Sequence, residues 1–206
     1  MPIRVEIYGA DGIAVGQVLR SGHLREILEA GTELIVDDAA WHAIDGSPPR
    51  PVGRLTVDDD DILLAVADEI EDGPVHAQWH DVSLDVGPYR VTGQMPTMPG
   101  FDPGRALARP TGEFVLLRDV QIALVADEDG DSVGHRAVLV NRYVVDRVRA
   151  DMMLGFFFPG AHMTVTGGHD RFAAGAAASA AARDDGPGVP PAGEAGSVTG
   201  SAIPTV

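Results

Sequence analysis

The sequence contains no cysteine and no lysine, and only 5% of its residues are aromatic. The lack of cysteine excludes disulfides, thiolate chemistry and cysteine-ligated zinc. The lack of lysine excludes a Gly-x-x-x-x-Gly-Lys phosphate loop, and all 15 basic residues are arginines. High-GC codon usage and an acidic, salt-adapted surface both explain this arginine bias, and the sequence leaves both open. Because aromatics are few, a core must consist mainly of Val, Leu, Ile and Ala.

The chain also lacks a long uninterrupted apolar run and an excess of positive charge. Its formal net charge is −16, so its surface would repel nucleic acids and anionic membranes. The longest apolar stretch, Met152–Val165, is interrupted by Gly155 and Pro159 and is too short to span a bilayer. The N-terminus shows no signal-peptide core. We therefore expect a cytoplasmic protein with no membrane span and no nucleic-acid partner.

An internal repeat is the main positive feature of the sequence. Residues Val5–Val18 align without a gap to Val82–Met95, with four notable matches: Val5 with Val82, Ile7 with Leu84, Gly16 with Gly93, and Gln17 with Gln94. Apolar residues that alternate with polar ones are typical of half-buried strands, and glycine-containing turns follow in both segments. Chance similarity between β-rich segments is the alternative, but the shared Gly-Gln dipeptide favours a duplication.

Each copy continues with a helical turn and further strands. Leu24–Leu28 predicts a helical turn that ends before Gly31, and Pro103–Ala108 occupies the corresponding place in the second copy. The expected later strands are Leu34–Val36, Trp41–Ile44 and Ile62–Val66 in the first copy, matched to Phe114–Leu117, Val120–Val125 and Ala137–Val140 in the second, which adds Tyr143–Val148. We expect a mainly β protein of two tandem barrel-like or sandwich-like domains, each with about five short strands and one short helical turn.

These expectations divide the chain into five parts. Residues 1–72 and 82–150 are the two β-rich repeats, and residues 73–81 connect them. Residues 151–172 form an apolar segment rich in Met and Phe. The Ala/Gly/Pro tail, residues 173–206, has too few large apolar side chains to offset its ordering entropy, so we expect it to be disordered.

Three segments of the second repeat carry a resemblance to a known family. They are Val91–Gln94, Glu113–Val120 and the run Val138-Leu139-Val140-Asn141-Arg142. Over roughly Val82–Val148 the chain resembles a family of small bacterial β-rich domains of unknown function. The first repeat lacks the Asn-Arg pair, and Tyr143-Val144 stands where the family often has an acidic residue and a histidine. The resemblance implies a β-rich fold and assigns no catalytic residue.

Two acidic runs invite comparison with cation sites. Carboxylates of Asp58–Asp61 would alternate sides in an extended chain, so we expect a solvated hairpin turn before Ile62. Asp127–Asp131 looks like the start of a calcium loop, but the twelfth residue from Asp127 is Val138, where a bidentate glutamate is needed. A tight turn between two strands is the better interpretation.

Catalytic patterns are weak throughout the sequence. His76 and His80 are four residues apart and could share a face, yet no third metal ligand is identifiable. No Gly-x-Ser-x-Gly nucleophile motif and no Gly-x-Gly-x-x-Gly dinucleotide motif is present. We assign no catalytic, cofactor-binding or metal-ligating residue, and we expect no cofactor.

The segment Met152–Phe158 is the most unusual part of the chain. If exposed, its apolar side chains would form a docking or self-association surface: Met152, Met153, Leu154, Phe156, Phe157 and Phe158. The alternative is that they fill the interface between the repeats. We therefore predict a non-enzymatic interaction or accessory module with a protein partner or a second copy. A small-ligand-binding regulatory domain with a pocket in a barrel mouth or between the repeats is the alternative, followed by a metal-dependent hydrolase using His76 and His80.

Overall fold

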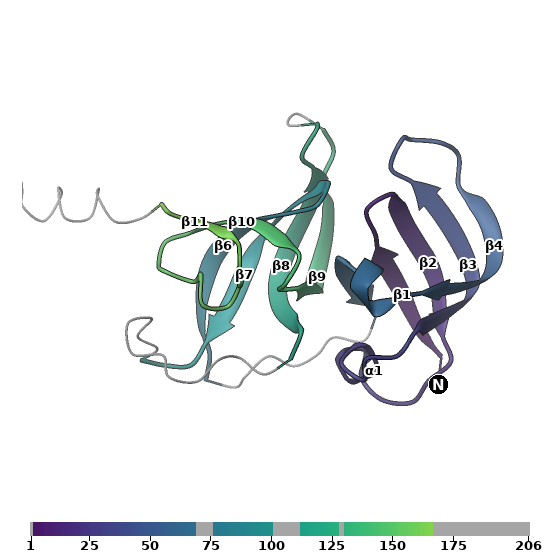
Figure 1. Ribbon diagram of the computed structural model, residues 1–206, viewed down its shortest axis with the longest axis horizontal. Coiled ribbons are helices and arrows are strands. Elements are labelled where there is room, and N and C mark those ends of the chain that lie inside the picture. The colour runs from purple at the N-terminus through teal and green to yellow at the C-terminus, as the bar shows by residue number, and fades with distance from the viewer. Residues whose placement is uncertain (1, 69–75, 101–111, 128–129, 167–206) are drawn as a thin grey trace, which may run out of the picture. The chain divides into compact units, whose positions relative to one another are not determined.

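The computed structural model describes residues 2–68, 76–100, 112–127 and 130–166. These residues form helix α1 (Leu24–Leu28), a 3₁₀ turn η1 (Asp59–Asp61) and eleven strands (Figure 1). The first half, residues 2–68, contains β1 (Ile3–Tyr8), β2 (Gly12–Val18), β3 (Leu34–Ala43), β4 (Arg50–Val57) and β5 (Leu64–Ala67). The second half, residues 76–166, contains β6 (Gln78–Val86), β7 (Tyr89–Thr97), β8 (Phe114–Leu124), β9 (Val133–Asn141), β10 (Val145–Ala150) and β11 (His162–Val165).

All the described strands belong to one sheet, in the order β11-β10-β6-β7-β8-β9-β5-β1-β2-β3-β4. Neighbouring strands are antiparallel except β10 and β11, which are parallel. The mainly β fold expected from the sequence is therefore confirmed. The two halves are joined where β5 pairs with β9, through Leu64 opposite Val140 and Ala65 opposite Leu139.

The strand order of the first half recurs in the second half. The order β5-β1-β2-β3-β4 matches β10-β6-β7-β8-β9 strand for strand. The register is also irregular at the same point in both halves, after Val15 in β2 and after Thr92 in β7. Opposite these points, Asp38 and Asp119 adopt φ angles of 52° and 51°, the left-handed region that aspartate tolerates better than most residues. The two halves therefore share a topology and a β-bulge.

The shared Gly-Gln dipeptide has a steric explanation at this bulge. A Cβ added to Gly16 would lie 2.7 Å from the Asp37 carbonyl oxygen, and one added to Gly93 would lie 2.9 Å from the Arg118 carbonyl oxygen. The bulged strand thus passes too close to its neighbour for any side chain at either glycine.

The bulge also explains why each of two predicted pairs of strands is in fact one strand. Leu34–Val36 and Trp41–Ile44 were expected as two strands, but they belong to one bent strand, β3, which ends at Ala43. Phe114–Leu117 and Val120–Val125 likewise belong to β8, which ends at Leu124. A bulge bends a strand without ending it, which explains why the interruption in the pattern is not a turn.

A second correction concerns the later strands of each half. Strand β4 was missed, because Pro51 and Gly53 weaken the β pattern; both are tolerated because β4 lies at the edge of the sheet. By strand order, Ala137–Val140 in β9 corresponds to β4, and the counterpart of β5 is β10. Helix α1 agrees with the prediction, and Pro103–Ala108 lies outside the described residues.

Two hydrophobic cores lie on opposite faces of the central strands. The first-half core also contains Phe114 and Leu116 from β8 of the second half. The second-half core also contains Tyr8 and Leu64 from the first half. Since successive side chains of a strand point to opposite faces, the side chains of β8 enter the two cores alternately. Each core is therefore completed by residues of the other half.

The predicted domain boundaries are only partly covered by the described residues. The boundary between residues 72 and 73 and the tail 173–206 lie outside them, and β6 begins at Gln78 within the predicted connector. All described elements belong to one contact unit that ends at Gly168, and the division into two tandem domains stays a prediction. None of the helices in the described part of the chain is long and apolar enough to cross a membrane.

Candidate functional site

The segment Met152–Phe158 is mostly absorbed by the second-half core. Leu154 and Phe158 are fully buried in it. Met153 is 53% exposed. The other three side chains are half-buried: Met152, Phe156 and Phe157. The segment therefore presents far less apolar surface than its composition suggests, and its role as a docking surface stays a prediction.

The Asn-Arg pair of the predicted family motif holds this region in place. Asn141 donates from Nδ2 to Glu113 Oε1 at 3.1 Å and accepts from the Tyr143 backbone N–H at 3.0 Å. Arg142 is almost fully buried and donates from Nη2 to the Phe156 carbonyl oxygen at 3.4 Å. The pair thus ties the end of β9 to the neighbouring turns, which is a structural role.

The two histidines singled out in the sequence are not brought together at a metal site. His76 is exposed, whereas His80 is buried with its Nε2 3.0 Å from Thr97 Oγ1 and its Nδ1 3.6 Å from Asp151 Oδ1. Within residues 2–68, 76–100, 112–127 and 130–166, no three His, Asp or Glu side chains are grouped to hold a metal ion. Thr97 is 4% exposed and donates to the Gln78 carbonyl oxygen, so its hydroxyl is poorly placed as a nucleophile.

The described residues of the two acidic runs are not part of any group that could hold a metal ion. Asp58 precedes the 3₁₀ turn η1 and Asp59–Asp61 form it, where the sequence predicted a hairpin turn. Asp127 accepts the Gly130 N–H through its backbone carbonyl, as expected for a turn between β8 and β9; residues 128 and 129 lie outside the described residues.

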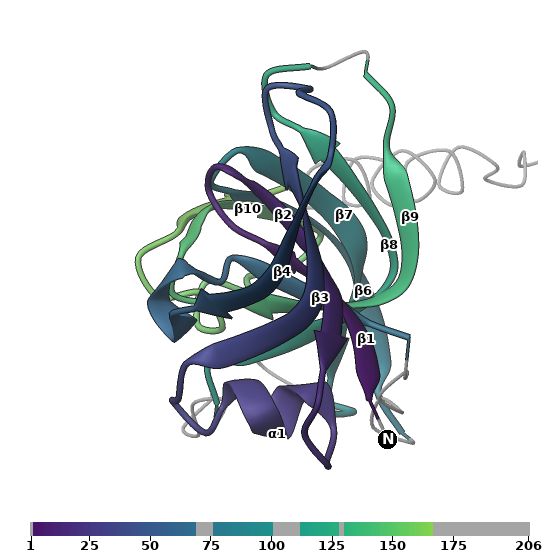
Figure 2. The ribbon, with the colours of Figure 1, turned by 90° about the vertical axis from the view of Figure 1, so that its right-hand side faces the viewer.

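A cavity of about 190 Å³ lies where hairpins of the two halves meet, and we call it the tip cavity. The first half supplies the end of β1, the start of β2 and the end of β3, and the second half supplies the start of β7, the end of β8 and the start of β9. Figure 2 shows the β3–β4 and β8–β9 connections at the same end of the molecule. Most of the lining is apolar, including Ile13, Ile44, Ile122, Leu124 and Val133.

Two tyrosines form the aromatic wall of the tip cavity. The rings of Tyr8 and Tyr89 meet edge to face, with centroids 5.3 Å apart, a favoured arrangement of aromatic pairs. Tyr8 donates from its hydroxyl to Glu6 Oε2 at 3.1 Å, and His135 Nε2 lies 3.0 Å from the same hydroxyl. Tyr89 donates to the Gly9 carbonyl oxygen at 3.0 Å. Both hydroxyls are thus engaged by the protein, and both side chains are almost fully buried, so only a small part of each ring faces the cavity.

Burial keeps both phenols in their neutral form. It raises the pKa of Tyr8 well above its usual value, and the nearby Glu6 carboxylate raises it further. Burial, with a smaller contribution from the charge of Asp11, raises the pKa of Tyr89 to about 12. The wall of the cavity therefore stays uncharged at neutral pH.

Sequence reasoning missed these tyrosines, although a signal was present. Val5 and Ile7 alternate toward the first-half core, so the same alternation places Tyr8 on the opposite face with Glu6. A large aromatic side chain on a face expected to be solvated indicates that another part of the protein covers it. Here the cover is Tyr89, which lies next to a hairpin turn of the second half.

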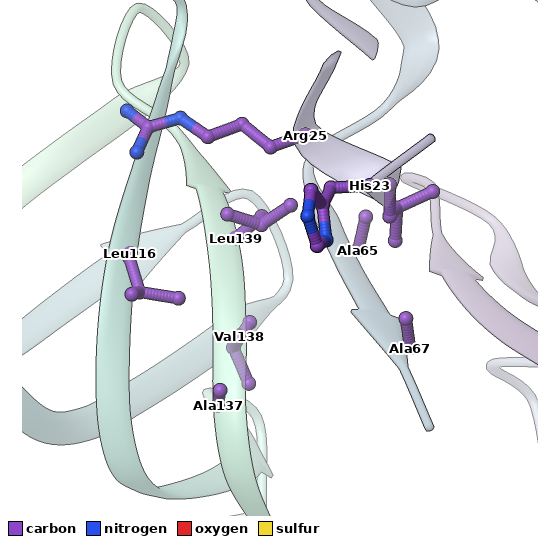
Figure 3. Close-up of a pocket in the computed structure, with 9 residues that line it drawn as sticks. His23, Arg25, Ala65, Ala67, Leu116, Ala137, Val138 and Leu139 are labelled. Atoms are coloured by element: carbon purple, nitrogen blue, oxygen red, sulfur yellow. The ribbon is translucent and has the colours of Figure 1, made fainter. Parts of the chain in front are cut away.

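Two further hollows are less suited to a small molecule. One of about 20 Å³ lies at the seam between β5 and β9, where His23, the residue before α1, and Arg25 of α1 approach Ala65 and Leu139 (Figure 3). A space of this size holds about one water molecule. Another of about 370 Å³ in the first half is lined by Trp41 and three aspartates: Asp11, Asp60 and Asp61. A ligand there would have to displace water from several carboxylates, which is costly.

Comparisons of the chain with protein-family models, with curated proteins and with solved structures give no match. The resemblance to small bacterial β-rich domains therefore stays a prediction.

Proposed function

We propose that this chain is a non-enzymatic binding module that holds a small, largely apolar molecule in the tip cavity. The observation that carries the proposal is an apolar hollow of about 190 Å³ with a wall of two neutral tyrosines and contributions from both halves. Ligand sites are typically concave and apolar with a few polar groups that fix orientation. The proposal takes up the alternative predicted from the sequence, a small-ligand-binding regulatory domain with a pocket in a barrel mouth or between the repeats.

The size of the cavity restricts its ligand to roughly one aromatic ring with a short substituent. An apolar protein cavity of about 150 Å³ accommodates benzene. The tip cavity is slightly larger and open at its rim, where His42 and Asp131 are the titratable lining residues. The expected ligand is therefore a one-ring compound with a polar group that reaches the rim.

A ligand screen on the full chain tests the proposal. Binding of a one-ring aromatic compound to the folded state at a hundredfold excess over its Kd adds about 2.7 kcal/mol of stability. For a protein of this size each kcal/mol corresponds to a Tm rise of about 2–4 °C. We expect at least one compound in a panel of one-ring aromatics to raise the Tm by several degrees.

A pair of variants distinguishes ligand binding in the tip cavity from ligand binding elsewhere on the protein. Val133 lines the cavity and Val52 in β4 does not, and both are exposed strand valines. Val133→Trp would fill the cavity and abolish the Tm shift, whereas Val52→Trp would preserve it. The proposal fails if the whole panel leaves the Tm unchanged, or if Val133→Trp responds as the wild type does.

Docking of a partner on Met152–Phe158 remains a second candidate. The observation in its favour is the exposure of Met153 beside the half-buried ring of Phe156. Because Phe157 packs against the core, Met153→Ser is the cleaner test. A reduced molar mass in light scattering relative to the wild type would support self-association, and a monomer in both cases would contradict it.

A further inference from the structure

Building on the proposed binding function, we infer that the ligand of the tip cavity is an arylalkyl amine, a single aromatic ring joined by a short chain to a protonated nitrogen. The cavity has an aromatic, apolar interior and an acidic rim, so it offers one environment for each end of such a molecule.

The ring end fits the interior. The cavity of about 190 Å³ is large enough for one aromatic ring, and its lining includes Tyr8, Tyr89, Ile122 and Leu124. Since the hydroxyls of both tyrosines are bonded within the protein, the interior offers few free hydrogen-bonding groups. A polar group buried there would lose its water without a replacement partner, which is unfavourable. The polar end of the ligand must therefore point to the rim.

One carboxylate of the second half lines the cavity, and one of the first half lies near Tyr89 outside the lining. Asp131, from the connection between β8 and β9, lines the cavity and is exposed. Asp11, from the β1–β2 turn, lies close enough to Tyr89 for its charge to affect the phenol. Among the described residues no arginine or histidine forms an ion pair with Asp131, and the lining contains no arginine.

The nearby cation is already engaged elsewhere. Arg90, which follows Tyr89 in β7, donates from Nε to Asp85 Oδ1 at 3.0 Å. An ammonium group at the rim would therefore meet the Asp131 carboxylate, which attracts cations and can accept a charge-assisted hydrogen bond. A ligand carboxylate would be repelled by Asp131 and by the net charge of −16.

Three probes with the same ring and similar chain length test this inference by isothermal titration calorimetry on the full chain. They are 2-phenylethylamine, 2-phenylethanol and 3-phenylpropionate. We expect the amine to bind about tenfold or more tightly than the alcohol, as a charge-assisted hydrogen bond implies, and the carboxylate to bind most weakly.

The matched variants are Asp131→Asn and Asp127→Asn. Both remove one negative charge from the same connection, but only Asp131 lines the cavity. Asp131→Asn should weaken amine binding to the level of the alcohol and leave alcohol binding unchanged, whereas Asp127→Asn should change neither.

The outcomes distinguish this inference from the proposed function. Equal binding of the amine and the alcohol, or equal effects of the two variants, overturns the amine inference and leaves the cavity as an apolar site. If none of the three probes binds, the amine inference fails, and the thermal screen of the wider panel decides the proposed function separately.

Discussion

At the scale of single residues, Asp85 is the most heavily paired carboxylate of the described structure. Its Oδ1 accepts from Arg90 Nε at 3.0 Å and from Arg149 Nη1 at 3.1 Å, and its Oδ2 accepts from Arg149 Nη2 at 3.0 Å. Burial alone would raise the pKa of Asp85, but these hydrogen bonds outweigh it and hold the pKa below its usual value. The carboxylate therefore contributes to stability as long as it is ionised.

The contribution of Asp85 should disappear in acid. A carboxylate with a lowered pKa stabilises the fold fully above its unfolded pKa of about 3.9, and this stabilisation is lost as the pH falls through the lower folded value. Asp85→Asn should cost about 1–3 kcal/mol at pH 7, and its stability should begin to approach that of the wild type only as the pH falls below about 4, with convergence complete below the lowered folded pKa. Urea unfolding across this pH range measures the difference.

Asp81 provides the control for this experiment. It is an exposed strand aspartate whose carboxylate accepts from the neutral Gln94 amide at 3.1 Å. Asp81→Asn should change stability much less at pH 7. A gap between wild type and Asp85→Asn that persists at pH 2.5 would contradict the role given to the arginine pairs.

The bulge glycines give a second prediction at this scale. Gly16→Ala and Gly93→Ala place a Cβ against the backbone of the bulged strand, and such overpacking costs about 1–3 kcal/mol. Gly155→Ala is the control, because its Cβ would meet only Met163 Cβ at an ordinary 3.8 Å. Thermal unfolding should show a lowered Tm for the first two variants only; equal Tm values for all three would show that the bulge can relax.

At the scale of elements, β8 and β3 occupy the same position in the two halves but differ in burial. Counting from the bulge residues Asp119 and Asp38, Leu116 of β8 corresponds to Ile35 of β3. Leu116 is 6% exposed and belongs to the first-half core, whereas Ile35 is 39% exposed. The central strand is covered on both faces, and its counterpart is covered on one.

Because of this difference in burial, truncating the two corresponding side chains to alanine should lower the stability of the fold by unequal amounts. Leu116→Ala should destabilise the protein by about 2–5 kcal/mol, as for a buried aliphatic residue. Ile35→Ala should cost about 1 kcal/mol or less, because much of its side chain is already in water. Chemical denaturation of the two variants measures both values. Similar losses would mean that the first half does not cover Leu116 of β8 as described.

The elements that the sequence could predict are those with local signals. The hairpin β1–β2, helix α1 and the hairpin β6–β7 follow from alternation and from glycine-containing turns. Strand β4 could not be predicted, since Pro51 and Gly53 oppose a strand unless it lies at an edge. The tip cavity could not be predicted because Tyr8 and Tyr89 meet only through the pairing of β5 with β9, for which no local pattern exists.

At the scale of the whole molecule, the exchange of residues between the two cores determines how the protein unfolds. Tyr8 and Leu64 of the first half pack in the second-half core, and Phe114 and Leu116 of the second half pack in the first-half core. A half that unfolded alone would leave apolar side chains of the other half uncovered. The two halves should therefore unfold together, despite their repeated strand order.

The two tryptophans of the chain make this prediction measurable. Trp41 lies in β3 of the first half and Trp79 in β6 of the second, and both are half-buried. In Trp79→Phe the fluorescence reports the first half, and in Trp41→Phe it reports the second. Each urea curve should coincide with the circular dichroism curve of the same variant, as expected for a two-state transition.

Leu64→Ala, added to both variants, extends the test to the contact between the halves. Leu64 is fully buried in the second-half core, although it belongs to the first half. Its truncation should lower stability by about 2–5 kcal/mol and shift both fluorescence curves by the same amount. Two separate midpoints, or a shift confined to one tryptophan, would instead identify two independent domains. The tip cavity would then lie between two halves that fold separately. A ligand would bind only when both halves are folded, so it would stabilise each half only while the other is folded.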